Sequence, residues 1–272
     1  MAPVNLGTEF RVATNGIETH GWRTGGDGPP LLLLHGLTDN GACWAMLARE
    51  LAADYDLVMP DARGHGESSA PEMGYSLEDR TADAIALIDA LHLDRPVVIG
   101  HSMGGLTAAQ LAAQAPERIR GAILEDPAFI SPENWASPQR LSWKEQHQLT
   151  LAMREEELIA RGRAESPRWH PDVFPTWARS KLEAKIAVFD WLQLPHSDFW
   201  AISTQIAVPT LLVTGEPELG AIISAEVAAA LQASNPLLEV AHVPGVGHCI
   251  RYEQPHQFAS LTRTFLARQF KV

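Results

Sequence analysis

The sequence predicts an α/β fold in which a mostly parallel sheet of eight strands is flanked by helices. Short apolar runs of strand length alternate with stretches of helical periodicity, and this alternation is typical of βαβ units. A Gly-x-Ser-x-Gly sequence at residues 100–104 lies between a strand-like run and a helix-forming stretch. Strand, sharp turn and helix are the context in which such a sequence exposes its serine at the top of a sheet.

The expected elements follow one another along the chain. Residues 8–14 and 17–24 flank Asn15-Gly16, a strong hairpin signal, so the chain should open with an antiparallel pair at the sheet edge. Continuous apolar runs, typical of strands buried on both faces, predict six further strands. These runs lie at residues 31–34, 55–59, 96–99, 121–124, 209–213 and 237–241. Helices are expected at residues 44–51, 76–91, 106–113, 224–231 and 255–270. Ser76 and Asp79 have the spacing of a capping box.

The alternation stops between residues 128 and 207, where no run has a convincing strand pattern. Helices are expected there at residues 142–160 and 178–192. We interpret residues 1–127 and 208–272 as one catalytic core domain of the α/β type. Residues 128–207 are then a helical cap inserted into that core.

Six of the eight tryptophans fall within the expected cap. Aromatic side chains have a large apolar surface, so a cap that roofs a binding site can present them to an apolar ligand. We expect part of the set to line the substrate pocket; the alternative is that they only fill the core of the cap. The candidates for substrate binding are Trp135, Trp143, Trp177 and Trp191.

Ser102 is the candidate nucleophile and His248 the candidate base. In a parallel sheet, ligands bind at the carboxyl ends of the strands. Ser102 lies just past one predicted strand end, and His248 follows the last strand in a glycine-flanked loop. A serine hydroxyl needs a neighbouring base to act as a nucleophile, and histidine titrates near neutral pH. Of the other histidines near strand ends, His101 should point away from Ser102, His35 is expected to shape its loop, and His65, in a glycine-rich turn, is expected to be structural.

Five short motifs occur in an order and at spacings that resemble the α/β-hydrolase fold superfamily, over essentially the whole chain outside the expected cap. They are His35-Gly36, Asp61-x-Arg63-Gly64-x-Gly66-x-Ser68, Gly100-His101-Ser102-Met103-Gly104-Gly105, Gly215-x-x-Glu218 and Gly247-His248. The chain is similar to the esterase, lactonase and cofactor-free haloperoxidase branch, which carries a serine nucleophile. Related haloalkane dehalogenases and epoxide hydrolases carry aspartate where this chain has Ser102. The resemblance implies an oxyanion hole formed by the backbone N–H groups of Leu37 and Met103.

The resemblance leaves the acid of the triad open among three carboxylates. Superfamily members usually carry it where Glu218 lies, three residues after Gly215, but the stretch from there to Ile222 is longer than usual in this chain. Some branches, including fungal zearalenone-type lactonases, place the acid after the preceding strand, where Asp126 lies. We choose Asp126, with Glu218 as the alternative and Glu125 as a third candidate.

These residues together predict a serine hydrolase that cleaves a carboxylic ester or lactone of a fairly apolar substrate through an acyl-enzyme. Because acyl-enzyme chemistry is shared, the same triad could serve amide or carbon–carbon bond hydrolysis, or cofactor-free perhydrolysis. Outside the enzymes, the alternative is a ligand receptor with negligible turnover, like some plant hormone receptors of the superfamily.

Composition narrows the partners and the location. A net charge of -12 without a Lys/Arg cluster argues against nucleic acid and anionic membranes as partners. The sequence shows no signal-peptide pattern and no long apolar stretch, so we expect a cytoplasmic monomer or homodimer that acts on a small molecule. The two cysteines make neither a disulfide framework nor a metal set, and no cofactor-binding motif occurs, so no metal and no cofactor are expected.

Overall fold

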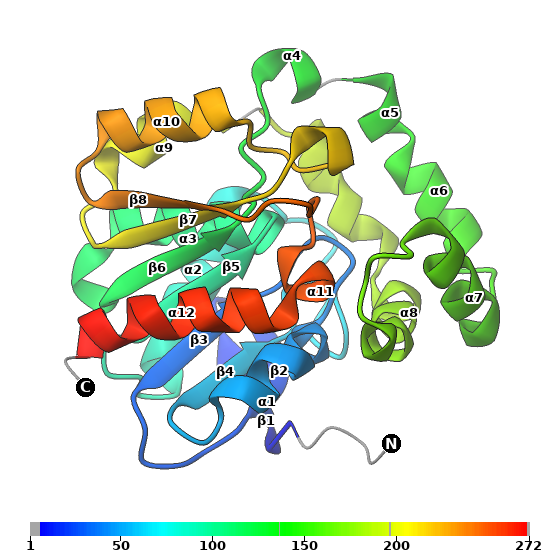
Figure 1. The fold of residues 1–272 in the computed structure, drawn as a ribbon. Coiled ribbons are helices and arrows are strands. Elements are labelled where there is room, and N and C mark those ends of the chain that lie inside the picture. Colours follow the sequence, from blue (N-terminus) through cyan, green and yellow to red (C-terminus); the bar gives the residue numbers. More distant parts are fainter. Residues whose placement is uncertain (1–5, 136, 196, 271–272) are drawn as a thin grey trace.

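The computed structural model describes residues 6–135, 137–195 and 197–270 (Figure 1). Within these residues, eight strands form one sheet in the order β1-β2-β4-β3-β5-β6-β7-β8. The strands are β1 (Thr8–Thr14), β2 (Ile17–Arg23), β3 (Pro30–Leu34), β4 (Asp56–Pro60), β5 (Val97–His101), β6 (Gly121–Glu125), β7 (Thr210–Thr214) and β8 (Leu238–His242). Neighbours from β4 to β8 pair in parallel, whereas β2 is antiparallel to both β1 and β4. The predicted eight-stranded, mostly parallel sheet is confirmed.

The antiparallel edge is set by a two-residue turn. Asn15 and Gly16 both have positive φ, 36° and 79°, as a type I′ hairpin turn requires. The turn fixes the register in which Thr14 lies opposite Ile17. The predicted hairpin is therefore confirmed, and it places β2 beside β4.

Helices cover both faces of the sheet (Figure 1). Those of the two outer layers are α1 (Ala45–Leu51), α2 (Leu77–Ala90), α3 (Met103–Gln114), α10 (Ala225–Ser234), α11 (Ile250–Glu253) and α12 (Pro255–Phe270). In β3, Leu31 and Leu33 belong to the apolar cluster formed with α1 and α12, while Leu32 belongs to the cluster formed with α2 and α3. Successive residues of a strand point to opposite faces, so one continuous apolar run serves both layers.

The start of α2 has the expected capping box. The Ser76 side chain accepts a hydrogen bond from the Asp79 N–H (3.1 Å), and the Asp79 carboxylate accepts one from the Ser76 N–H (2.9 Å). The first bond satisfies an amide that the start of a helix leaves without an intrahelical acceptor. The helix therefore begins where the sequence predicts.

A run of helices connects β6 to β7. It comprises α4 (Pro132–Trp135), α5 (Pro138–Leu141), α6 (Trp143–Thr150), α7 (Glu155–Glu165), a short 3₁₀ helix at Pro171–Val173, α8 (Phe174–Glu183), a longer 3₁₀ helix at Ile186–Gln193, and α9 (Phe199–Gln205). Among the described residues of this connection there is no strand. Figure 1 shows α6, α7 and α8 grouped beside the sheet. The division into a core and a cap domain stays a prediction. Of the helices that the structure describes, none has the length and apolar character needed to cross a membrane.

Both helices predicted in this connection are wrong in extent. The helix predicted over residues 142–160 is two helices, because Arg154 begins α7 anew and its N–H donates to the Glu157 side chain (3.0 Å). The helix predicted over residues 178–192 is interrupted at Ala184, which has extended backbone, and it continues as a 3₁₀ helix. Helical periodicity alone does not reveal either break.

Candidate active site

Ser102 lies at the turn between β5 and α3 in a backbone conformation that few side chains adopt. Its φ is 50° and its ψ is -113°. Such a conformation costs roughly 1–3 kcal/mol and persists only where the surroundings enforce it. The Ser102 N–H donates to the carbonyl of Glu125 (3.0 Å), which ties the turn to the end of β6. Glycines flank the serine because a Cβ on Gly100 would collide with the carbonyl of Gly104, and one on Gly104 with that of Leu34.

Ser102, Leu37 and His248 line one cavity of about 340 Å³. Met103 is buried and is the first residue of α3, so its N–H is one of the amides that have no acceptor within the helix. The positive end of the helix dipole at this position favours a negative charge. The structure thus brings the predicted nucleophile, the predicted base and Leu37 of the predicted oxyanion hole around one space.

Asp126 is the carboxylate that lies against His248. Nδ1 of His248 and Oδ2 of Asp126 are 2.6 Å apart. Because a carboxylate accepts, Nδ1 is the donor of this pair, which directs Nε2 away from Asp126. Asp126 is fully buried, and its two oxygens also accept the N–H groups of Ile222 (2.8 Å) and Ile223 (3.1 Å). Three donors therefore hold the carboxylate in one orientation.

The other two candidate acids lie elsewhere. Glu218 is exposed on a short 3₁₀ turn. Glu125 is buried, and its oxygens accept the backbone N–H (2.8 Å) and the NH1 group (3.1 Å) of Arg251. Of the three candidates, Asp126 is the one within hydrogen-bond distance of His248 in the part of the chain described.

His101 contacts His248 and lines the same cavity. Its Nε2 donates to the backbone carbonyl of His248 (3.2 Å), and the two ring centroids are 4.6 Å apart. Burial lowers the pKa of His101 well below its usual value, so the ring is neutral. Gly36 provides the space for this ring, since a Cβ there would come within 2.7 Å of His101 Nδ1.

Two histidines hold the loop between β3 and α1, which carries Leu37. Nε2 of His35 accepts the N–H of Ala62 (2.9 Å), and Nε2 of His65 accepts the N–H of Thr38 (3.2 Å). Both rings are buried, which lowers their pKa values and keeps the neutral form that can accept. These contacts agree with the loop-shaping role expected of His35 and the structural role expected of His65.

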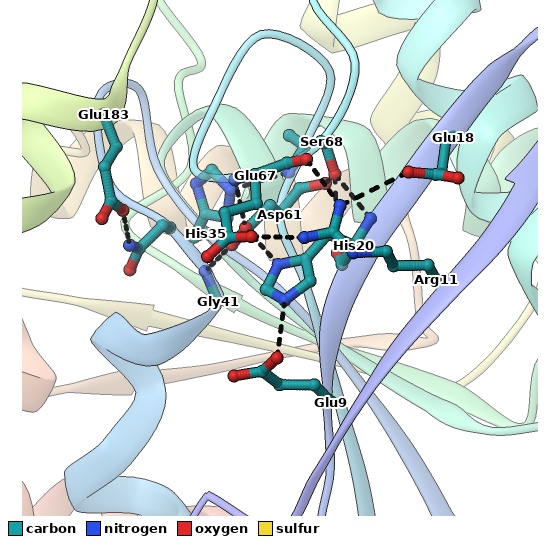
Figure 2. A network of polar contacts seen from close by, with 12 residues as sticks. Glu9, Arg11, Glu18, His20, His35, Gly41, Asp61, Glu67, Ser68 and Glu183 are labelled. Atoms are coloured by element: carbon teal, nitrogen blue, oxygen red, sulfur yellow. Dashed lines mark hydrogen bonds and ion pairs between the residues drawn. The ribbon is translucent and has the colours of Figure 1, made fainter.

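Asp61 is the centre of a buried polar network that explains the motif it begins (Figure 2). One carboxylate oxygen accepts the N–H of Gly41 (2.8 Å), and the other lies close to Nδ1 of His20 (2.8 Å) and accepts the N–H of Glu67 (2.9 Å). Ser68 donates its hydroxyl to the Asp61 carbonyl (2.7 Å). The motif therefore holds the loop that carries Leu37 against the loop of residues 61–68. Sequence reasoning missed His20, because a histidine within an alternating strand gives no local signal.

The four candidate tryptophans fall into two groups. Trp143 and Trp177 line the cavity that contains Ser102. Trp135 and Trp191 line a different cavity of about 490 Å³, and their ring centroids are 5.0 Å apart in an edge-to-face contact. They are only 9% and 5% exposed. Their position supports a packing role, and Trp143 and Trp177 remain the candidates for substrate contact.

The cavity also has charged and polar side chains that the sequence does not point to, among them Asp39, His147, Arg161, Glu165 and Lys181. Asp39 accepts hydrogen bonds from Lys181 Nζ (2.6 Å) and from Arg251 (2.7 Å). Burial alone would raise the pKa of Asp39, but the two cations outweigh burial and lower it to about 2. These residues come from separate segments, so no local spacing predicts their meeting. The available signal was the place of Asp39 in the loop that follows a predicted strand end.

A family model for the α/β hydrolase fold matches residues 29–255, so the chain belongs to this family and the resemblance of its motifs is confirmed. N-formylmaleamate deformylase of Pseudomonas putida is 30% identical over an alignment 272 residues long. The alignment covers 94% of this chain and 95% of the relative. The 2-(acetamidomethylene)succinate hydrolase of Mesorhizobium japonicum is 29% identical over 245 residues, 86% of each chain. Among solved structures, an enol-lactonase from Burkholderia xenovorans has a TM-score of 0.78 at 25% identity, with 95% of this chain and 100% of the other covered.

Proposed function

We propose that the protein is a serine hydrolase that cleaves a carboxylic ester or lactone through an acyl-enzyme. The observation that carries the proposal is the buried carboxylate of Asp126, 2.6 Å from the ring of His248, which lines the same cavity as Ser102. An imidazole oriented by a carboxylate, beside a serine on a sharp turn, is the combination that activates a hydroxyl group.

In the proposed reaction, Oγ of Ser102 attacks the acyl carbon while Nε2 of His248 takes the hydroxyl proton. The acyl oxygen becomes an oxyanion, which the N–H groups of Leu37 and Met103 stabilise. The imidazolium, held by Asp126, then protonates the leaving alkoxide as the carbon–oxygen bond breaks. His248 next takes a proton from water, which attacks the acyl-enzyme. The imidazolium then returns this proton to Oγ of Ser102 as the ester bond breaks and the acid is released.

The cavity lining supports a substrate with an apolar portion. Trp143, Trp177 and Phe189 contribute apolar surface to the cavity wall. Arg161 and Lys181 lie on the same wall, and each is paired with a carboxylate of that wall, Glu165 (2.8 Å) and Asp39 (2.6 Å). Ligand sites commonly combine an apolar lining with a few polar groups that fix orientation. We therefore propose that the substrate combines an apolar portion with a polar end that can hydrogen-bond to these charged pairs.

Amide hydrolysis is the second candidate, and the curated relatives favour it. A deformylase and an acetamidomethylene-succinate hydrolase each align with most of this chain. The proposed residues would act in the same order on an amide. The difference is that His248 must deliver its proton to a poorer, nitrogen leaving group.

A series of 4-nitrophenyl esters of increasing acyl length, assayed with wild type and Ser102→Ala, tests the proposal. We expect wild type to hydrolyse the esters with a preferred acyl length, and Ser102→Ala to lose at least about 10³-fold in kcat. Parallel assays with 4-nitroacetanilide separate ester from amide hydrolysis. The proposal would be contradicted if wild type hydrolysed none of these substrates and a fluorophosphonate left Ser102 unlabelled, and a receptor role would then be favoured.

We also propose that residues 128–207 act as a cap, that the protein is a monomer or homodimer and that it is cytoplasmic. The cap is supported by the cavity, whose lining combines Ser102 and His248 with side chains of α6, α7 and α8. The other two proposals rest on the sequence. Light scattering coupled to size-exclusion chromatography tests the oligomeric state.

A further inference from the structure

One buried arginine joins the segments that carry the proposed catalytic groups. Arg251 lies in α11, three residues after His248, and is 3% exposed. Its NH2 group donates to Oδ2 of Asp39 (2.7 Å), and its NH1 group donates to Oε2 of Glu125 (3.1 Å). Both carboxylates are themselves buried. A single guanidinium therefore connects two loops and the end of a strand.

On one side, Arg251 holds the loop that carries Leu37. Asp39 lies two residues after Leu37, and its N–H donates to the carbonyl of Gly36 (3.1 Å), so Asp39 belongs to the turn around Leu37. Nζ of Lys181 reaches the other oxygen of Asp39 (2.6 Å) from α8. Because the carboxylate is held by both cations, a shift of Arg251 would move the turn and with it the Leu37 N–H.

On the other side, Arg251 holds the end of β6. Glu125 accepts both the backbone N–H (2.8 Å) and the NH1 group (3.1 Å) of Arg251. Glu125 immediately precedes Asp126, and its carbonyl accepts the N–H of Ser102 (3.0 Å). The Arg251–Glu125 contact therefore links the segment that follows His248 to the strand end that precedes Asp126 and that binds the Ser102 turn.

The chemistry of arginine suits this position. A guanidinium is a planar fork whose donors point in fixed directions, whereas a lysine has one compact ammonium group. Cζ of Arg251 lies 4.6 Å from the ring centroid of Trp44 and 4.2 Å from that of Tyr252. The two aromatic rings hold the plane of the fork, so the two carboxylates are held at a fixed separation.

We propose that Arg251 is a positioning residue that sets the Leu37 N–H and the His248–Asp126 pair relative to Ser102. The proposal rests on the hydrolase function proposed above. A misplacement of about 1 Å in such groups can cost on the order of 10²-fold in rate. Because Arg251 is buried and acts through other residues, binding of the ground-state substrate should change little.

Arg251→Lys tests the proposal through two readouts. One is steady-state hydrolysis of the 4-nitrophenyl ester that wild type prefers, and the other is the Kd of phenylboronic acid, which forms a tetrahedral adduct with an activated serine. We expect kcat to fall about 10²-fold while KM changes by less than about threefold. The boronate Kd should rise together with the loss of kcat/KM, because both report stabilisation of a tetrahedral state.

Arg23→Lys is the control for an arginine–carboxylate pair away from the site, with a side chain that is more exposed than that of Arg251. Arg23 donates through Nε (2.9 Å) and NH2 (2.7 Å) to Asp56 on the neighbouring strand β4, so its replacement disrupts an arginine–carboxylate pair elsewhere in the sheet. We expect this variant to lose stability and to keep kcat and the boronate Kd. Equal losses of kcat in Arg23→Lys and Arg251→Lys would overturn the proposal.

A folded Arg251→Lys with kcat and boronate Kd within about twofold of wild type would also overturn it. If Arg251→Lys does not fold, Glu125→Gln takes its place, since it keeps the shape of the side chain and removes one charge. We expect Glu125→Gln to lower kcat about tenfold and to raise the boronate Kd by a similar factor. An unchanged kcat and boronate Kd would overturn the proposal. Lack of fluorophosphonate labelling of wild-type Ser102 would instead contradict the hydrolase function, so the two failures are distinct.

Discussion

Nδ1 of His248 lies 2.6 Å from Oδ2 of Asp126, and the same carboxylate accepts two consecutive backbone N–H groups, those of Ile222 and Ile223. Asp126 follows β6, whereas the two isoleucines follow β7. The segment after β7 carries Glu218, which the sequence offers as the alternative acid of the triad. In this chain that segment supplies two backbone donors that hold an acid from the neighbouring strand.

Asp126→Asn is expected to lower kcat about 10⁴-fold with the fold retained, because the imidazole loses the partner that fixes its tautomer and stabilises its charged form. Ester hydrolysis measures the loss, and circular dichroism checks the fold. Glu218→Gln is the control and should keep near-normal turnover, since Glu218 is exposed. The opposite pattern, with activity lost in Glu218→Gln and kept in Asp126→Asn, would reverse the assignment.

Trp143→Ala should weaken the binding of esters with long acyl chains, because Trp143 lines the cavity that contains Ser102. We expect KM for the longest ester that wild type accepts to rise about tenfold, equivalent to about 1.4 kcal/mol of binding, with KM for the acetate changed less. Kinetics across the ester series measure this ratio.

Trp191→Ala is the matched control for Trp143→Ala. Trp191 is buried against the second cavity, so its loss should cost about 3–5 kcal/mol of the free energy of unfolding and leave the acyl-length preference unchanged. Urea unfolding measures the stability of both variants. An altered preference in Trp191→Ala, with none in Trp143→Ala, would exchange the roles of the two residues.

Acid should destabilise the Leu37 loop through His65. Burial holds the pKa of His65 well below that of a free histidine, which is about 6.5. As the pH falls below the pKa of a free histidine, His65 takes up a proton in the unfolded chain but not in the folded chain. The contribution of neutral, buried His65 to the free energy of unfolding is therefore complete above that pKa and is lost as the pH falls below it. The Tm of wild type should therefore fall between about pH 7.5 and pH 5.5, and His65→Gln should show a smaller fall. Equal falls would refute this role.

His20 should act in the opposite sense and provides the comparison. Its hydrogen bond to Asp61, opposed by burial, raises the pKa of His20. The contribution of His20 is therefore present below the pKa of the unfolded chain and lost as the pH rises through the raised folded value. His20→Gln should cost more stability at about pH 5.5 than at about pH 8, measured by urea unfolding. A larger cost at the alkaline end would show that the sign is wrong.

The sheet and its turns were predictable because their causes are local. The Asn15-Gly16 turn, the apolar run of β3 and the Ser76–Asp79 capping box each depend on residues adjacent in the sequence. The break before α7 was not predictable from periodicity, because it depends on a competing cap at Arg154.

Ser102 and His248 were predictable as candidates because strand ends of a parallel sheet meet at one edge. The ion pairs around them were not. Lys181 reaches Asp39 from 142 residues away, and Arg251 from 212 residues away, so they meet only when the chain is folded. The same holds for Trp143 and Trp191. They line different cavities, and their spacing along the chain does not reveal this difference.

The most direct test of an activated Ser102 is the site and rate of fluorophosphonate labelling, followed by intact mass and peptide mapping in wild type, Ser102→Ala and His248→Gln. We expect a single label on Ser102 in wild type, none in Ser102→Ala, and labelling slowed about 10³-fold or more in His248→Gln, which lacks the base. Labelling of another residue, or equal rates in wild type and His248→Gln, would contradict the serine–histidine–aspartate site.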